Sequence, residues 1–137
     1  MSLEIINHDG RRCAEIIWAN TTVEKSTFFS PEESSFQFGL LAHDSGFVEP
    51  AHYHPRITRT IEDLQQMFVV QRGAVAVDFY TEDGRRFREV ILRAGDAIVI
   101  IAGVHAIRVL EKMQCVSIKQ GPFLGVENDK INVEVRR

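Results

Sequence analysis

The amino-acid sequence predicts an all-β protein, either a sandwich or a closed barrel. Its 137 residues include 14 Val and 13 Ile but only 7 Leu and 10 Ala. Branching at Cβ restricts χ1 in a helix and packs well on a pleated sheet, so this composition favours strands. Roughly ten short apolar runs recur along the chain, separated by turn residues, and helical periodicity is weak throughout.

Turn residues divide the chain into the predicted strands. Gly10, Pro31 and Gly46 precede the first three runs, whereas Gly73 and Gly84 end the fourth and fifth. Glycine and proline favour turn conformations, so each marks a boundary between strands. The expected strands are 12–18, 35–42, 47–54, 65–72, 74–81, 86–92, 97–102, 105–110, 113–119 and 130–135.

The clearest hairpin pairs 74–81 with 86–92. Asp83-Gly84 lies between these runs and supplies the positive φ that tight hairpin turns require. Residues 60–63 resemble a helix capping box, but the apolar run behind them, 67–70, is strand-like.

Length, charge and cysteine content fit one globular domain, residues 1–137. The formal charge is 16 Lys+Arg minus 19 Asp+Glu, or −3, which argues against nucleic-acid or membrane binding through bulk positive charge. The longest apolar run, 97–102, is far shorter than the ~20 residues that span a bilayer, and the N-terminus shows no signal-peptide pattern. Cys13 and Cys115 form no paired motif, so we expect free thiols and a cytoplasmic protein.

Three of the five histidines form the most informative pattern in the sequence. His52 and His54 lie two positions apart on the predicted strand 47–54, where alternate side chains face the same side. His105 follows the predicted strand 97–102 after a tight turn at Gly103. Imidazoles that face one cavity are typical ligands of a divalent transition metal.

These two stretches resemble the two motifs of the cupin superfamily. The first motif reads Gly, five residues, His-x-His, a short gap, Glu, six residues and Gly. Residues 46–73 match it through Gly46, His52, His54 and Gly73. The second motif reads Gly-Asp, then Pro-x-Gly, then His. Residues 95–110 match it through Gly95, Asp96, Gly103 and His105. The resemblance implies a single cupin domain, a double-stranded β-helix (jelly-roll) barrel of two antiparallel sheets, and a homodimer.

The sequence departs from the cupin pattern in three ways. Gln66 stands where the family has a Glu ligand, and an amide oxygen is a neutral and poorer donor to a divalent cation. Residues 55–65 separate His54 from Gln66, where most cupins have three or four residues. His105 comes one residue earlier than usual, and Ile101 takes the place of the motif's proline.

The resemblance implies a metal site made of His52, His54 and His105, with Gln66 as a weak fourth ligand. The metal would be Fe, Mn, Ni or Zn. His54 and His105 are also the candidate catalytic residues, because an imidazole can act as a general acid or base near neutral pH.

The surroundings of the histidines also resemble a cupin subgroup from bacterial surface-polysaccharide and nonulosonic-acid gene clusters. The segments that carry this likeness are 52–55, Arg56 and Arg59, 77–83 and 119–123. It implies a sugar context and no defined reaction. Arg56 and Arg59 would orient an anionic substrate, or else form a solvated face with acidic neighbours.

Strand alternation assigns further residues to the cavity or to its outside. Phe68 and Val70 share a face with Gln66 and are expected to line the cavity, with Phe68 contacting substrate. Glu49 is an alternative metal ligand, but alternation from His52 points it outward.

Three functions remain open at this point. The first is a metal-dependent isomerase, epimerase or dioxygenase that acts on a small sugar-derived or carboxylated substrate. The second is a metal-independent cupin of the sugar-nucleotide ketoisomerase type, in which histidines move the proton. The third is a non-catalytic sugar-binding module, consistent with the missing Glu ligand.

Overall fold

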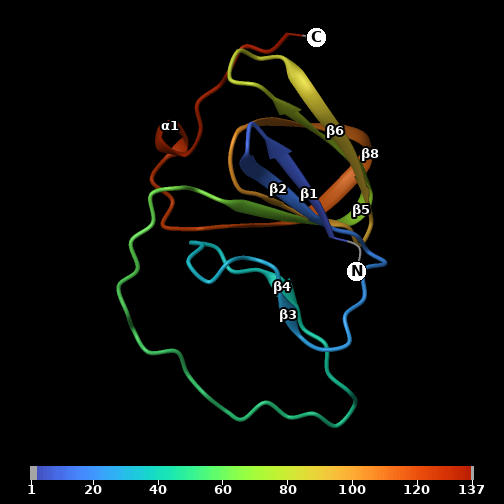
Figure 1. Ribbon diagram of the computed structural model, residues 1–137, viewed down its shortest axis with the longest axis vertical. Coiled ribbons are helices and arrows are strands. Elements are labelled where there is room, and N and C mark those ends of the chain that lie inside the picture. Colours follow the sequence, from blue (N-terminus) through green and yellow to red (C-terminus); the bar gives the residue numbers. More distant parts are fainter. Residues whose placement is uncertain (1–2, 137) are drawn as a thin grey trace. The chain divides into compact units, whose positions relative to one another are not determined.

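The computed structural model describes residues 3–136 and has an all-β fold, as the sequence predicts. Its main sheet is antiparallel, with the order β1-β2-β7-β5-β6 and with β8 paired to β5 (Figure 1). A second, two-stranded sheet pairs β3 with β4. The elements are β1 (Leu3–His8), β2 (Arg11–Ile17), β3 (Thr27–Phe28), β4 (Gly39–Leu40), β5 (Gln66–Tyr80), β6 (Arg86–Arg93), β7 (Ala97–Ile100), β8 (Val104–Lys119) and α1 (Val126–Asp129).

The chain divides into two compact units, and each is described by itself. Residues 22–63, which we call the loop unit, contain β3 and β4. Residues 3–21 and 64–136, which we call the sheet unit, contain the main sheet and α1. No helix in the described part of the chain is long and apolar enough to cross a membrane.

The sheet unit is organised around β5, which pairs along both of its edges. One edge pairs with β7 at Gln66–Val69 and with β6 at Ala74–Tyr80, while the other edge pairs with β8 over the whole strand. The side chains of this sheet form the core, in which Val70, Val77 and Leu92 are fully buried. The sheet is curled, as an antiparallel half-barrel is (Figure 1).

The structure joins two pairs of predicted strands into two long ones. The expected strands 65–72 and 74–81 are one strand, β5, and 105–110 and 113–119 are one strand, β8. The β5–β8 register shifts between Val70 and Val75, so extra residues are absorbed as bulges and the ladder continues. Gly73 makes this possible with a φ of 82°, and a Cβ atom there would lie 2.1 Å from the Lys112 carbonyl oxygen.

The predicted hairpin is confirmed. Residues Ala74–Tyr80 of β5 pair with Arg86–Arg93 of β6, and Gly84 has a φ of 87° in the connecting turn. The turn is closed by the Thr81 N–H, which donates to the Arg85 carbonyl at 2.8 Å. Residues 60–63 form no helix, as expected.

Predicted strands in the loop unit and at the C-terminal end of the chain are wrong. Residues 47–54 form no strand, and of 35–42 only Gly39–Leu40 is paired. The segment 130–135 is not a strand either, and only Arg136 beyond it forms a bridge, with Arg85. Conversely, β1 was not predicted. A strand needs a neighbour for its N–H and C=O groups, and local alternation cannot show whether that neighbour exists.

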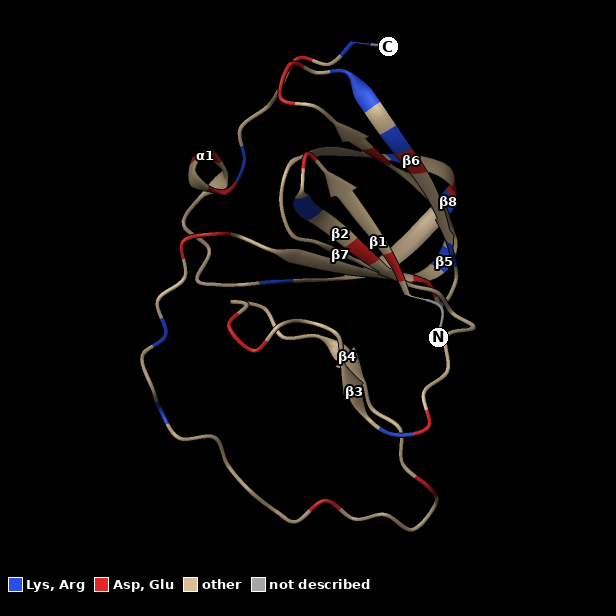
Figure 2. Ribbon diagram, viewed as in Figure 1, with Lys and Arg blue, Asp and Glu red and all other residues tan. Residues whose placement is uncertain are grey.

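A buried carboxylate ties the three strands β5, β6 and β8 together. The Asp78 side chain is 1% exposed, and Arg108 donates to its two oxygens from Nε and Nη2 at 2.6 and 3.1 Å. Arg86 and Glu89 complete the network from β6, where Figure 2 shows a run of charged residues. The hydrogen bonds from Arg108 hold the pKa of Asp78 below its usual value, against the opposing effect of burial.

We expect Asp78→Asn to lower the free energy of unfolding by about 2 kcal/mol at pH 7, because Arg108 loses a charged, bidentate partner. Since the pKa of Asp78 is depressed in the fold, its contribution is full above about pH 4 and is lost as pH falls through the depressed value. Urea denaturation of both proteins from pH 7 to pH 2 measures this difference.

The control is Glu111→Gln, which removes the exposed Arg93–Glu111 ion pair at 3.7 Å. An exposed pair of this kind contributes about 0.5 kcal/mol or less. Equal effects of the two substitutions would contradict the role given to Asp78.

We also expect Gly73→Ala to lower the free energy of unfolding by about 3 kcal/mol, because its Cβ would collide with the Lys112 carbonyl. Gly10→Ala is the matched control, since Gly10 has a similar φ of 72° but no atom within 4 Å of the added Cβ. Gly10→Ala should lower the free energy of unfolding only through backbone strain, by about 1 kcal/mol. Urea denaturation of both variants distinguishes them, and equal losses would show that the bulge tolerates a side chain.

Candidate functional site

The loop unit holds the two histidines of the first motif close together. The ring centroids of His52 and His54 are 5.2 Å apart and the rings are nearly perpendicular, at 89°. Both side chains are exposed and neither residue is in a strand. The two imidazoles are therefore neighbours, although the strand from which their common orientation was predicted is absent.

The backbone selects the tautomer of His52. Its Nδ1 lies 2.8 Å from the Pro50 carbonyl oxygen, which can only accept, so Nδ1 carries the proton. In the neutral ring the lone pair is then on Nε2, and this atom lies 3.9 Å from the Glu49 carboxylate. Glu49 therefore lies beside His52, and the expectation that it points away is wrong because segment 47–54 does not alternate as a strand.

His105 belongs to the sheet unit and has the same arrangement. It is the second residue of β8, and its Nδ1 lies 3.2 Å from the Gly103 carbonyl oxygen, so Nε2 again holds the lone pair. His105 is opposite Phe79 in the ladder, which places its side chain on the same face of the sheet as Phe79.

Gln66 is the first residue of β5 and lies opposite Lys119 at the far end of the same ladder. Its Nε2 donates to the Ser117 hydroxyl at 2.9 Å. The amide nitrogen is therefore engaged, and Oε1 is the atom that could coordinate a cation.

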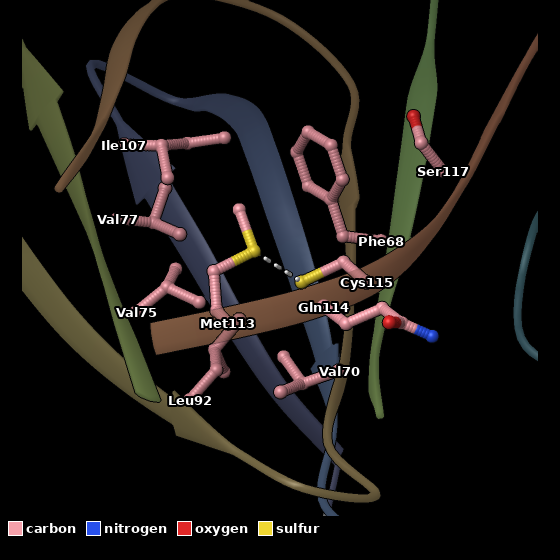
Figure 3. A pocket seen from close by; sticks show the side chains of 10 residues that line it. All are labelled: Phe68, Val70, Val75, Val77, Leu92, Ile107, Met113, Gln114, Cys115 and Ser117. Carbon is pink, nitrogen blue, oxygen red and sulfur yellow. Dashed lines mark hydrogen bonds between the residues drawn. The ribbon is translucent and has the colours of Figure 1, made fainter. Parts of the chain in front are cut away.

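An apolar cavity of about 350 Å³ lies within the sheet unit (Figure 3). Phe68 and Val70 line it, as expected from the face they share with Gln66. The neighbouring strand β8 contributes five residues that the sequence analysis did not assign to a cavity, Ile107, Met113, Gln114, Cys115 and Ser117. The two-residue spacing of Met113, Cys115 and Ser117 was the available signal.

Two sulfur atoms meet in this cavity. The Cys115 thiol contacts the Met113 thioether at 3.4 Å, as Figure 3 shows. Burial raises the pKa of the Cys115 thiol, since the charged thiolate loses hydration there.

Arg56 and Arg59, the candidate anion-binding residues, are exposed in the loop unit. Arg59 Nη1 donates to the Ile57 carbonyl at 3.4 Å, a contact within its own segment. Both guanidinium groups are thus accessible to a ligand from solvent.

The Gly-Asp pair of the second motif has a structural function. Asp96 accepts from the backbone N–H groups of Ala19 and Arg93, both at 2.8 Å, one with each carboxylate oxygen. Gly95 adopts a φ of 91° in the same turn. Asp96 therefore fixes the turn before β7 and links it to the segment after β2.

The structure brings some candidate residues together within a unit, and leaves others apart. His52 and His54 adjoin in the loop unit, whereas Gln66 and His105 lie at opposite ends of the β5–β8 ladder in the sheet unit. Among residues 3–136, no three His, Cys, Asp or Glu side chains gather as a metal-binding group.

Comparison with known proteins assigns no family. No family model, no curated protein and no solved structure matches the chain.

We expect Cys115 to react with iodoacetamide several-fold more slowly than glutathione at pH 8, because its raised pKa leaves less thiolate. The rate should rise with pH to a more alkaline midpoint than that of glutathione. Mass spectrometry of the Cys115 peptide measures it, and the same peptide in unfolding concentrations of urea is the control. Reaction of the folded protein at the rate of glutathione would contradict the burial of this thiol.

Proposed function

We propose that this protein is a metal-binding cupin with a jelly-roll barrel, and that it acts on a small sugar-derived or carboxylated substrate. His52, His54 and His105 would bind one Fe²⁺, Mn²⁺, Ni²⁺ or Zn²⁺ ion, without the expected fourth ligand Gln66, which lies at the opposite end of the β5–β8 ladder from His105. The observation that carries the proposal is the contact of Nδ1 with a backbone carbonyl oxygen in both His52 and His105, at 2.8 and 3.2 Å. In a neutral ring whose Nδ1 donates to that carbonyl, the Nε2 lone pair is left for a metal.

The donor chemistry fits such an ion. Neutral imidazoles suit all four metals, and a carbonyl that binds the second ring nitrogen is the usual means of orienting a histidine ligand. The closeness of His52 and His54, at 5.2 Å between ring centroids, also suits two ligands of one ion. The three imidazoles carry no negative charge and Glu49 beside His52 is a single carboxylate, so a bound divalent ion would keep a net positive charge and attract an anionic substrate.

The proposed roles of the remaining residues follow from their chemistry. Phe68 and the apolar cavity would hold the carbon skeleton of the substrate and exclude water. Arg56 and Arg59 would bind its carboxylate, since a guanidinium pairs with a carboxylate through two hydrogen bonds. A bound ion would supply Lewis-acid polarisation, while His54 or His105 would transfer protons if not engaged as a ligand.

We also propose a cytoplasmic homodimer. Both cysteines, Cys13 and Cys115, are free, which fits a reducing compartment. Pairing of two copies would cover exposed sheet edges.

Elemental analysis of purified protein, without a histidine tag or added metal, tests the assignment. We expect about one transition-metal ion per chain in the wild type and less than a tenth of that in His52→Ala and His105→Ala. His43→Ala is the matched control, because His43 is also in the loop unit but stacks on Phe47 and contacts Ser26.

Full metal content in either His52→Ala or His105→Ala would overturn the ligand assignment. An empty wild-type protein that also refuses added Fe²⁺, Mn²⁺, Ni²⁺ and Zn²⁺ would leave the metal-independent isomerase or the sugar-binding module in its place.

A further inference from the structure

The sheet unit contains a second recess, a cleft of about 550 Å³, at the end of the sheet where two turns meet. One wall is the β1–β2 turn, which contributes His8 and Arg11, and the other is the β5–β6 turn, which contributes Asp83 and Arg85. A volume of this size accommodates a ligand of one or two rings. None of the residues proposed above to bind metal or substrate lines this cleft.

Aromatic rings form one side of the cleft. The imidazole of His8 stacks on Phe87, with ring centroids 4.3 Å apart and an interplanar angle of 18°. Phe79 lies behind Phe87, with a centroid separation of 6.4 Å. The His8 side chain is 33% exposed, so part of this ring stack faces the cleft and can receive the flat face of another ring.

Three acidic residues line the cleft, Asp9, Glu82 and Asp83, and two of them, Asp9 and Asp83, have partners within the protein. Asp9 lies 3.3 Å from His8 Nε2. Asp83 pairs with Arg136 at 2.6 Å and accepts from the Thr81 hydroxyl, and this hydroxyl holds the pKa of Asp83 below its usual value. Both carboxylates thus have cationic or hydrogen-bonding partners within the protein.

The guanidinium groups in the cleft are not engaged in this way. Within residues 3–136, neither Arg11 nor Arg85 makes a side-chain hydrogen bond or an ion pair, although Arg85 lies close enough to influence Asp83 electrostatically. Arg11 and Arg85 thus line the same cleft as the aromatic stack, and the N–H donors of a guanidinium match a carboxylate.

We propose that this cleft binds a small ring that carries one carboxylate. The ring lies against the His8–Phe87 stack, and the carboxylate accepts hydrogen bonds from Arg11 and Arg85. A neutral ring gains only the stacking contact and is held much less tightly. None of the proposed metal ligands belongs to this site and no metal takes part in it, although Gly103, whose carbonyl oxygen contacts His105, also lines the cleft.

Two carboxylated rings with neutral counterparts test the proposal: D-glucuronate against D-glucose, and benzoate against benzamide. Titration of ¹⁵N-labelled protein, followed by NMR, measures affinity and location together. We expect at least one of the two carboxylates to bind, and its neutral counterpart to bind at least tenfold more weakly. The largest changes in amide chemical shift should be at and around His8, Arg11 and Arg85.

Arg11→Gln and Arg85→Gln remove one guanidinium each and should each weaken binding about tenfold. Both residues are exposed, so both variants should remain folded. Arg93→Gln is the matched control, an exposed arginine of β6 that pairs with Glu111 and lies outside the cleft, and it should bind as the wild type does.

Three results would overturn the proposal. These are no binding of either carboxylate, equal binding of the neutral counterparts, and wild-type affinity in both the Arg11→Gln and the Arg85→Gln variant. The metal content of the protein does not enter into any of them, so this test and that of the metal site succeed or fail separately.

Discussion

The two-sided pairing of β5 is the constraint on which the rest of the sheet unit depends. A strand of 15 residues that pairs with β6, β7 and β8 satisfies its own backbone groups and fixes the register of its three neighbours. That pairing persists through the middle only because the chain bulges around Gly73, where no side chain fits. Asp78 of β5 adds a polar link to β6 and β8, because Arg108 of β8 and Arg86 of β6 both contact its carboxylate.

The β5 strand also determines which recess each side chain lines. Alternate residues of a strand share a face, so Val75 and Val77 line the apolar cavity, and Phe79, two positions further on, lines the cleft. The two recesses differ in chemistry because of their other walls. Met113 and Cys115 make the cavity apolar, whereas the turns at the end of the sheet supply arginines to the cleft. One sheet face therefore offers two chemically distinct environments.

Backbone carbonyls orient the rings of two of the candidate metal ligands. In His52 the acceptor is the Pro50 carbonyl and in His105 it is the Gly103 carbonyl, in each case two residues earlier in the chain. A local contact of this kind orients the ring before any ligand binds, so less conformational entropy is lost on binding. The Gln66 amide nitrogen donates to the Ser117 hydroxyl, but Gln66 lies at the opposite end of the β5–β8 ladder from His105.

The sequence by itself determined the features that depend on local patterns. These are the all-β class, the hairpin at Asp83-Gly84, and the shared face of Phe68 and Val70, because strand alternation and turn chemistry are properties of neighbouring residues. Only the tertiary structure decided that β5 continues through Gly73, that residues 47–54 form no strand, and that His8 stacks on Phe87 across the sheet. The physical reason is that each of these depends on a partner distant in the chain, either a strand that satisfies backbone hydrogen bonds or a ring that fills the adjoining space, and no local pattern encodes that partner.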